Sequence, residues 1–162
     1  MIKDTNNIPN AVKALRELDG SKMRAGILDD GKIHMIAHVQ EYGATIVPKS
    51  GDYLMVPMRD GTFRKLKSVT IPSRPFIAQT VVQHSNQWKQ RVKEMGMAAI
   101  GGEDVSGLKK NLANKMSLDI KTTMASGSFT ANAPLTIQNK GGSRPLIDTG
   151  ALQGAVRGEV EK

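Results

Sequence analysis

The chain contains no cysteine and few aromatic residues, and both absences narrow the classes of protein to which it can belong. Without cysteine, disulfide scaffolds, thiolate zinc sites and cysteine nucleophiles are excluded. Aromatic residues make up only 4% of the 162 residues. The core must therefore consist mainly of Val, Ile, Leu and the nine methionines, which fill irregular gaps and adaptable interfaces.

Long apolar runs are also missing. No window approaches the ~20 apolar residues of a membrane-spanning helix. The first ten residues, MIKDTNNIPN, contain no apolar run of the kind that forms a signal peptide. We therefore expect no membrane partner and synthesis in a cytoplasm.

The composition otherwise fits one folded domain over residues 1–162, because hydrophobic residues make up 39% and charged residues 23% of the chain. The net charge is +8. Such a charge suits nucleic acid, an acidic protein partner or a solvated surface. No block of five basic residues occurs and the aromatics do not alternate with basic residues, so sequence-specific nucleic-acid binding is disfavoured.

Hydrophobic periodicity predicts an α+β fold. Short helices are expected over 8–18 and 33–42, with a strand over 22–28 between them. A long helix should begin near Ser73–Pro75, capped by Ser73 or Arg74 with Pro75 in the first turn. An apolar stripe runs along this helix through Ile77, Val81, His84, Trp88, Val92, Met95 and Ala99. A second stripe through Leu108, Leu112, Met116, Ile120 and Met124 predicts a second helix that packs antiparallel on the first.

Two less regular segments interrupt these elements. Residues 44–72 are expected to form a protruding β-hairpin or long loop, and residues 125–143 a flexible loop with a short strand at 135–138. Near the end, Asp148 or Thr149 should cap a short helix that runs through Leu152. A last strand containing Val156 and Val160 should pair with the strand over 22–28. The predicted architecture is a small, mostly antiparallel sheet packed against a long helix and a second helix, with the hairpin excursion.

Few residues suggest catalysis. His34, His38 and Glu41 have a spacing that could bind a metal on one helix face, but the HExxH order is absent and these residues fit a helix surface equally well. His84 on the long apolar stripe is expected to be a packed, hydrogen-bonded residue. The acidic pairs Asp29-Asp30 and Glu103-Asp104 fit turns. The sequence therefore predicts neither an enzyme nor a cofactor.

Three blocks carry a resemblance to a known family. They are HVQEYGAT (38–45), IPSRPFI (71–77) and RPLIDTGALQGAV (144–156). Together they resemble the tail-completion and head–tail joining (neck) proteins of long-tailed bacteriophages, over about half of the chain. Those families often show an E-aromatic-G-T element, a P-x-R-P-F helix start and a terminal PL-x-D-T-G-x-L. Here Tyr42 takes the aromatic place, and Ala44 intervenes before Thr45.

The resemblance implies a small α+β structural protein of the virion, assembled in the bacterial host cytoplasm, that joins the top of a tail to a filled head. Its implied partners are further copies of itself, in a six-fold or twelve-fold ring, and neighbouring connector, terminator and tail proteins. A basic lining of the ring would allow non-specific contact with DNA in the lumen. A tail-terminator or minor tail protein is the alternative within this class. A small basic DNA-binding protein is the alternative outside it, and a metalloenzyme built on His34, His38 and Glu41 is a third.

Candidate residues follow from these expectations. The excursion should supply the partner interface, because an exposed apolar hairpin is an aggregation liability unless a partner covers it. The expected interface residues are Tyr53, Leu54, Met55, Phe63, Arg64 and Lys65. The expected structural motif residues are Glu41, Tyr42, Gly43, Arg74, Pro75, Phe76, Asp148, Thr149 and Gly150.

Overall fold

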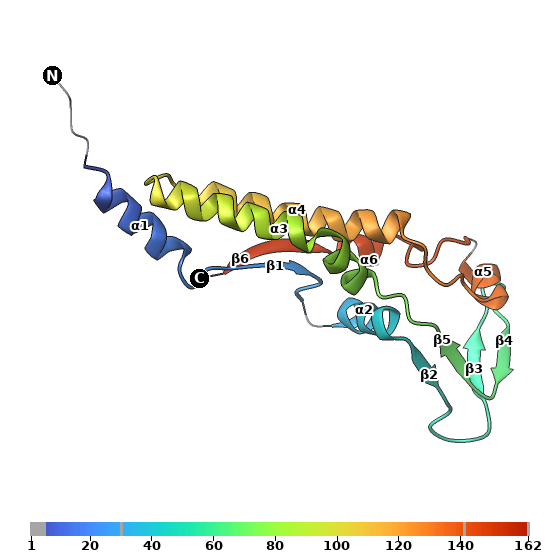
Figure 1. Cartoon of the computed structure of the whole chain (residues 1–162). Helices are drawn as coiled ribbons and strands as arrows, with labels where there is room; N and C mark the ends of the chain where they lie inside the picture. The colour runs from blue at the N-terminus through green and yellow to red at the C-terminus, as the bar shows by residue number, and fades with distance from the viewer. Residues whose placement is uncertain (1–5, 30, 141, 162) are drawn as a thin grey trace.

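The computed structural model describes residues 6–29, 31–140 and 142–161 (Figure 1). About 51% of the described residues are in helices and 16% in strands, which confirms the α+β class. The helices are α1 (Ile8–Leu18), α2 (Lys32–Tyr42), α3 (Phe76–Ile100), α4 (Ser106–Ser126), α5 (Pro134–Lys140) and α6 (Ala151–Gly154). The strands are β1 (Lys22–Gly26), β2 (Ala44–Ile46), β3 (Leu54–Pro57), β4 (Phe63–Leu66), β5 (Val69–Ile71) and β6 (Arg157–Glu161).

The long helices α3 and α4 form the predicted antiparallel hairpin (Figure 1). The buried side of α3 carries Phe76, Thr80, Met95 and Ala99. The predicted stripe is wrong in part, because Val81 and Val92 are exposed. Of the described elements, only α4 and, at one end, α1 make extensive contact with α3. The apolar stripe therefore cannot be buried over its full predicted width.

The C-terminal strand β6 pairs antiparallel with β1, as predicted, with Met23 opposite Val160 and Ala25 opposite Gly158. Both strands pack on α4. A Cβ added at Gly158 would lie 2.1 Å from the carbonyl oxygen of Ala113, so only glycine lets the strand approach the helix this closely. Residues 157–161 complete this ribbon by pairing along the whole of β1. Strand β1 is shorter than predicted and ends at Gly26.

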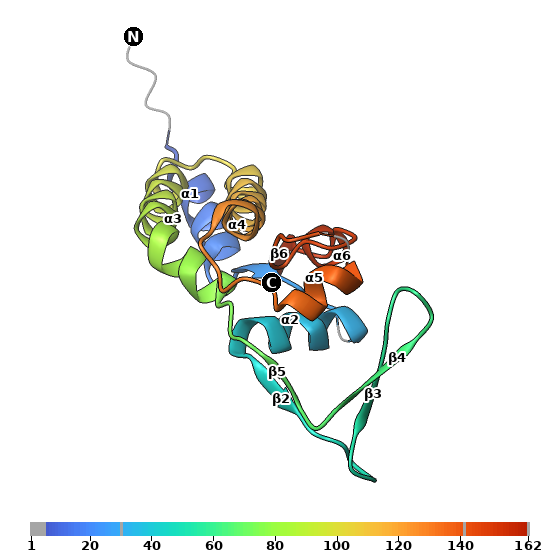
Figure 2. The same ribbon diagram turned by 90° about the vertical axis from the view of Figure 1, so that its right-hand side faces the viewer.

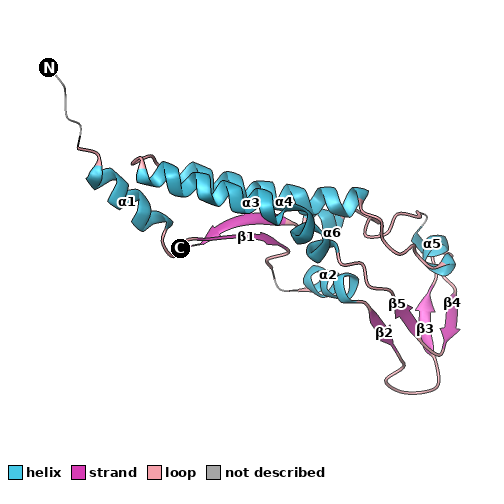
Figure 3. Cartoon of the chain, viewed as in Figure 1, coloured by secondary structure: helices cyan, strands magenta, loops and turns pink. Residues whose placement is uncertain are grey.

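Residues 44–71, here called the arm, form the predicted excursion as two successive ribbons. Strand β2 pairs with β5, and β3 pairs with β4 farther out. The outer turn is closed by a hydrogen bond from the Met58 N–H to the Thr62 carbonyl at 2.8 Å, and Asp60 Oδ1 accepts the Thr62 N–H at 2.9 Å. Figures 2 and 3 show the arm extending away from the long helices α3 and α4, with its strands in ribbons separate from β1 and β6.

Two local predictions near the C-terminus are wrong. Residues 135–138 are part of helix α5, not a strand, since Pro134 takes the first position of a helical turn. The N-cap of α6 is Gly150, in the left-handed region at φ 79°. Thr149 Oγ1 accepts the Ala151 N–H at 3.3 Å, so Thr149 rather than Asp148 supports this helix.

The main core lies where α2, α3, α4 and the C-terminal segment meet. Its buried apolar residues are Ala37, Phe76, Ile120, Met124, Leu146, Leu152 and Val156. A second, smaller cluster of Ala14, Ala99 and Val105 fixes α1 against the end of the helical hairpin. The molecule is therefore elongated, with α1 at one end and the arm at the other (Figure 1).

Candidate functional site

The first turn of α3 is capped by Glu41, which comes from α2. Glu41 is buried, with 7% of its surface exposed. Oε2 accepts the Ile77 N–H and Oε1 the Ala78 N–H, both at 2.9 Å. These N–H groups have no partner within the helix, and a negative charge there also favours the helix dipole. The predicted cap by Ser73 or Arg74 is wrong: Pro75 is the N-cap, Phe76 begins the helix, and the capping group lies more than 30 residues earlier.

Arg74 is buried, with 4% of its surface exposed, and it ties the segment after α4 to α2. Its Nη1 donates to Gln40 Oε1 at 2.6 Å and its Nε to the Thr130 carbonyl at 2.7 Å. Its Nη2 donates to Asn132 Oδ1 at 3.1 Å and to the Ala131 carbonyl at 3.3 Å. Burial lowers the pKa of Arg74, yet a guanidinium keeps its charge, and these neutral acceptors solvate it.

Gly43 marks the point where α2 ends and the arm begins. Its φ is 76°, and an added Cβ would lie 2.9 Å from both the Ile71 carbonyl oxygen and the Ser73 nitrogen. Ser73 Oγ donates to the Glu41 carbonyl at 2.7 Å across the same gap. Both ends of the arm are therefore held together at its base, and only glycine fits there.

Asn132 connects the third sequence block, residues 144–156, to Arg74. Its Nδ2 donates to the Arg144 carbonyl at 3.2 Å and to the Ser143 carbonyl at 3.4 Å. Glu41, Gly43, Arg74 and Phe76 of the expected motif residues thus lie in one junction at the base of the arm, and Asn132 connects the final block to it. Tyr42 is exposed and its ring lies against that of His38, with centroids 4.7 Å apart and the ring planes tilted by 50°.

The arm presents an exposed apolar face. Tyr53, Met55 and Phe63 are 48%, 54% and 61% exposed. Met55 lies opposite Lys65 in the β3–β4 register and Pro57 opposite Phe63, so these four share one face of the ribbon. Leu54 lies opposite Leu66 on the other face and is half-buried, as is Leu66. The predicted interface therefore divides into two faces, and Leu54 does not belong to the exposed one.

The inner face of the arm lines a groove of about 580 Å³. Its lining includes Val56 and Leu66 of the arm, Leu135 and Asn139 of α5, and Arg74. Asn139 Nδ2 donates to the Pro57 carbonyl at 3.0 Å across the groove. Helix α5 therefore contacts the inner face of the arm.

The three residues considered for metal binding do not converge on a metal site. His34, His38 and Glu41 line a shallow hollow, but the Glu41 carboxylate oxygens both accept α3 N–H groups. Within residues 6–29, 31–140 and 142–161, no group of three or more His, Asp or Glu side chains is placed to hold a metal ion.

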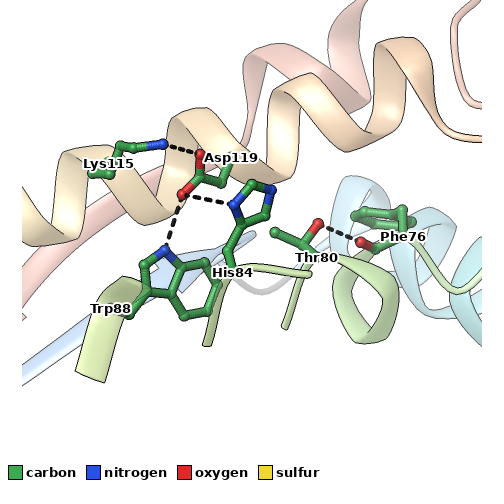
Figure 4. A network of polar contacts seen from close by, with 6 residues as sticks. All are labelled: Phe76, Thr80, His84, Trp88, Lys115 and Asp119. Carbon is green, nitrogen blue, oxygen red and sulfur yellow. Dashed lines mark hydrogen bonds and ion pairs between the residues drawn. The ribbon is translucent and has the colours of Figure 1, made fainter. Parts of the chain in front are cut away.

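A buried polar network between α3 and α4 is the second polar cluster of the fold (Figure 4). Asp119 is almost fully buried, and its Oδ2 accepts the Trp88 Nε1–H at 2.9 Å while Oδ1 accepts from Lys115. Burial acts to raise the pKa of Asp119, but the hydrogen bonds from Lys115 and Trp88 outweigh it, so the pKa lies below its usual value. The network connects the two long helices.

His84 lies beside this network without completing it. Its Nδ1 is buried, has no hydrogen-bond partner among the described residues, and lies 3.9 Å from Asp119 Oδ2. Its ring stacks on Trp88 with centroids 6.2 Å apart. The expectation of a packed histidine is confirmed, whereas the expected hydrogen bond is not made by Nδ1.

Comparison with family models, with curated proteins and with solved structures finds no match for this chain. None of the described helices is long and apolar enough to cross a membrane.

Proposed function

We propose that this chain is a structural protein of a long-tailed bacteriophage, which completes the tail end and joins it to the head within a ring-shaped neck assembly. The observation that carries the proposal is the arm. It projects from the helical body and holds Tyr53, Met55 and Phe63 in solvent. Monomeric proteins rarely expose such a cluster on a ribbon with open edges, and a partner would cover it.

The junction supports the same proposal. The family-like sequence blocks around Glu41 and Arg74 meet at the base of the arm, and Asn132 joins the block that begins at Arg144 to them. Their shared effect is to fix how the arm leaves the body. A flexible arm would lose conformational entropy on docking, and this loss would weaken binding. A protein that docks through its arm therefore benefits from an arm whose direction is already fixed.

Disruption of the gene in its phage, followed by negative-stain electron microscopy of the lysate, tests the proposal. DNA-filled heads lying apart from tails of normal length are expected. Tails of abnormal length would instead support a tail-terminator role. Intact, infectious particles would overturn a structural role of either kind.

A basic DNA-binding protein is the second candidate, and the charge of the arm favours it. Lys49, Arg59, Arg64, Lys65 and Lys67 are all exposed there. This candidate predicts that the isolated chain binds duplex DNA with an affinity that falls steeply with salt. In the neck proposal the same residues face neighbouring protein, or DNA only as it passes, so tight binding by the free chain is not expected.

A further inference from the structure

Three exposed apolar surfaces stand out on this molecule. The first is the outer face of the arm, with Met55 and Phe63. The second lies on α1, where Ile8, Val12 and Leu15 are 69%, 42% and 41% exposed. Their i, i+4, i+7 spacing places them in one stripe on the side of the helix away from Ala14, which packs against Ala99. The third is the outer side of α3 around Val81, Val82 and Val92.

Charge separates these surfaces. The arm, residues 44–71, has five basic and two acidic residues, a net charge of +3. Residues 81–93 of α3 carry three basic and no acidic residues, also +3. The α1 end, residues 8–19 and 101–106, carries two basic and four acidic residues, a net charge of −2. Its acidic residues Glu17, Asp19, Glu103 and Asp104 are all exposed.

The acidic character of the α1 end persists in the fold. The Ser106 N–H donates to Asp104 Oδ1 at 2.9 Å and its hydroxyl to Oδ2 at 2.8 Å, which lowers the pKa of Asp104. Asp19 is the C-cap residue of α1, and it lies about one helical turn beyond Leu15, the last residue of the apolar stripe. The α1 end therefore combines an apolar stripe with negative charge, whereas the arm combines an apolar face with positive charge.

We infer that the arm of one copy docks on the α1 end of a second copy, with Met55 and Phe63 against Ile8, Val12 and Leu15 and with Lys65 near Asp19. The inference rests on the proposed function in one respect, because a ring subunit needs such a contact between copies. The two surfaces lie at opposite ends of the elongated chain, so the contact is head-to-tail and leaves a free arm and a free α1 end for further copies (Figure 1).

Charge disfavours the other pairings that the arm could make with these surfaces. A two-fold contact of arm with arm would bring two surfaces of net charge +3 together, and arm against α3 would do the same. Only the α1 end offers apolar area together with the opposite charge. Repetition of the contact closes a ring if the rotation between copies divides a full turn, and otherwise gives a filament.

The absence of native cysteine allows a direct test by disulfide cross-linking. Phe63→Cys and Leu15→Cys are prepared as single variants of the full chain, mixed at high protein concentration and mildly oxidised. We expect heterodimers with a 63–15 disulfide, identified by peptide mass spectrometry, and a ladder of higher oligomers when both changes are in one chain. The matched control is Val82→Cys, whose native side chain is 82% exposed on α3. Cross-links of 63 with 82 or of 63 with 63 at equal yield, or no cross-links at all, would overturn the inference.

Charge reversal supplies a second readout that does not depend on the cysteines' reactivity. Lys65→Glu is expected to reduce the 63–15 yield severalfold, and Asp19→Lys in the partner variant is expected to restore it. An unchanged yield of the 63–15 cross-link in the Lys65→Glu variant would contradict the proposed placement of Lys65 near Asp19 of the second copy. The cross-linking result can be separated from the neck proposal. If gene disruption gives separated heads and tails but no 63–15 cross-links form, the docking contact alone is rejected. If 63–15 cross-links form but gene disruption leaves intact particles, the neck role alone is rejected.

Discussion

Glu41 and Ile77 are 36 residues apart in sequence, and the carboxylate of the first accepts the N–H of the second at 2.9 Å. This bond, with its counterpart at Ala78, means that α2 caps α3. The arm leaves α2 at Gly43 and returns just before α3, so the cap also fixes the base of the arm.

Removal of the capping carboxylate should destabilise the whole domain. Glu41→Ala leaves the N–H groups of Ile77 and Ala78 without their partner in a part-buried place, which should cost about 1–3 kcal/mol in the free energy of unfolding. Glu41→Gln retains one acceptor oxygen and should recover part of this. Urea unfolding followed by circular dichroism measures both. Exposed Glu94→Ala is the control and should stay within about 0.5 kcal/mol of the unchanged chain. Equal effects of Glu41→Ala and Glu94→Ala would contradict the capping role.

Gly43 and Gly51 provide a matched pair of backbone tests. Both have positive φ, 76° and 73°, so alanine strains either by about 1 kcal/mol. Only at Gly43 would the new Cβ also meet backbone atoms at 2.9 Å, whereas the space at Gly51 is open. Gly43→Ala should therefore lower the melting temperature clearly more than Gly51→Ala. A smaller effect at Gly43 would mean that the base of the arm is not closely packed.

Arg74→Lys tests the role of the buried guanidinium. Lysine retains the charge but cannot reach the Gln40, Thr130 and Asn132 oxygens together, so a loss of about 2–4 kcal/mol is expected. The segment around residues 130–132 should also lose its anchor. Limited digestion with trypsin should then cut after Lys140 faster than in the unchanged chain, under conditions where both proteins are folded. An unchanged cleavage rate would show that other contacts hold this segment.

Asp119 should make the free energy of unfolding depend on pH in the acidic range. Its folded-state pKa is lowered, so its contribution is present above the unfolded value of about 4 and is lost as the pH falls through the lower, folded value. Asp119→Asn should therefore be less stable than the unchanged chain at neutral pH, and the difference should shrink below about pH 4. Urea titrations at both pH values measure it. A difference that does not change with pH would contradict the charge pairing with Lys115.

Deletion of residues 46–66 should leave the body folded. The deleted part includes none of the main core residues and only Met58 among the buried apolar residues. Helix content by circular dichroism should stay as expected for the remaining residues, and the melting temperature should fall by no more than about 5 °C. Loss of the cooperative transition would show that the arm is part of the core and would remove it as an interface.

The sequence allowed the prediction of elements with strong local signals. Helices α1 to α4 and strand β1 with its C-terminal partner β6 all follow from hydrophobic periodicity. Helix α5 was missed because seven residues are too few for a clear helical period, and Leu135 and Ile137 alternate as in a strand.

The contacts of the junction could not be predicted, since they connect distant residues. The sequence singles out Glu41 and Arg74, but nothing local shows that Glu41 caps a helix beginning at Phe76 or that Arg74 binds residues 130–132. Asp119 is different, because the sequence does contain a signal for its contact. It lies next to Ile120, on the apolar side of α4, and four residues after Lys115, which is the spacing of an ion pair within a helix.

The most direct test of the central claim is complementation of the gene-disrupted phage with the chain that lacks residues 46–66, imaged by negative-stain electron microscopy beside the full chain. If the arm makes the joint, the full chain restores complete particles, whereas the shortened chain leaves filled heads and normal-length tails apart. Complete, infectious particles with the shortened chain would contradict the account.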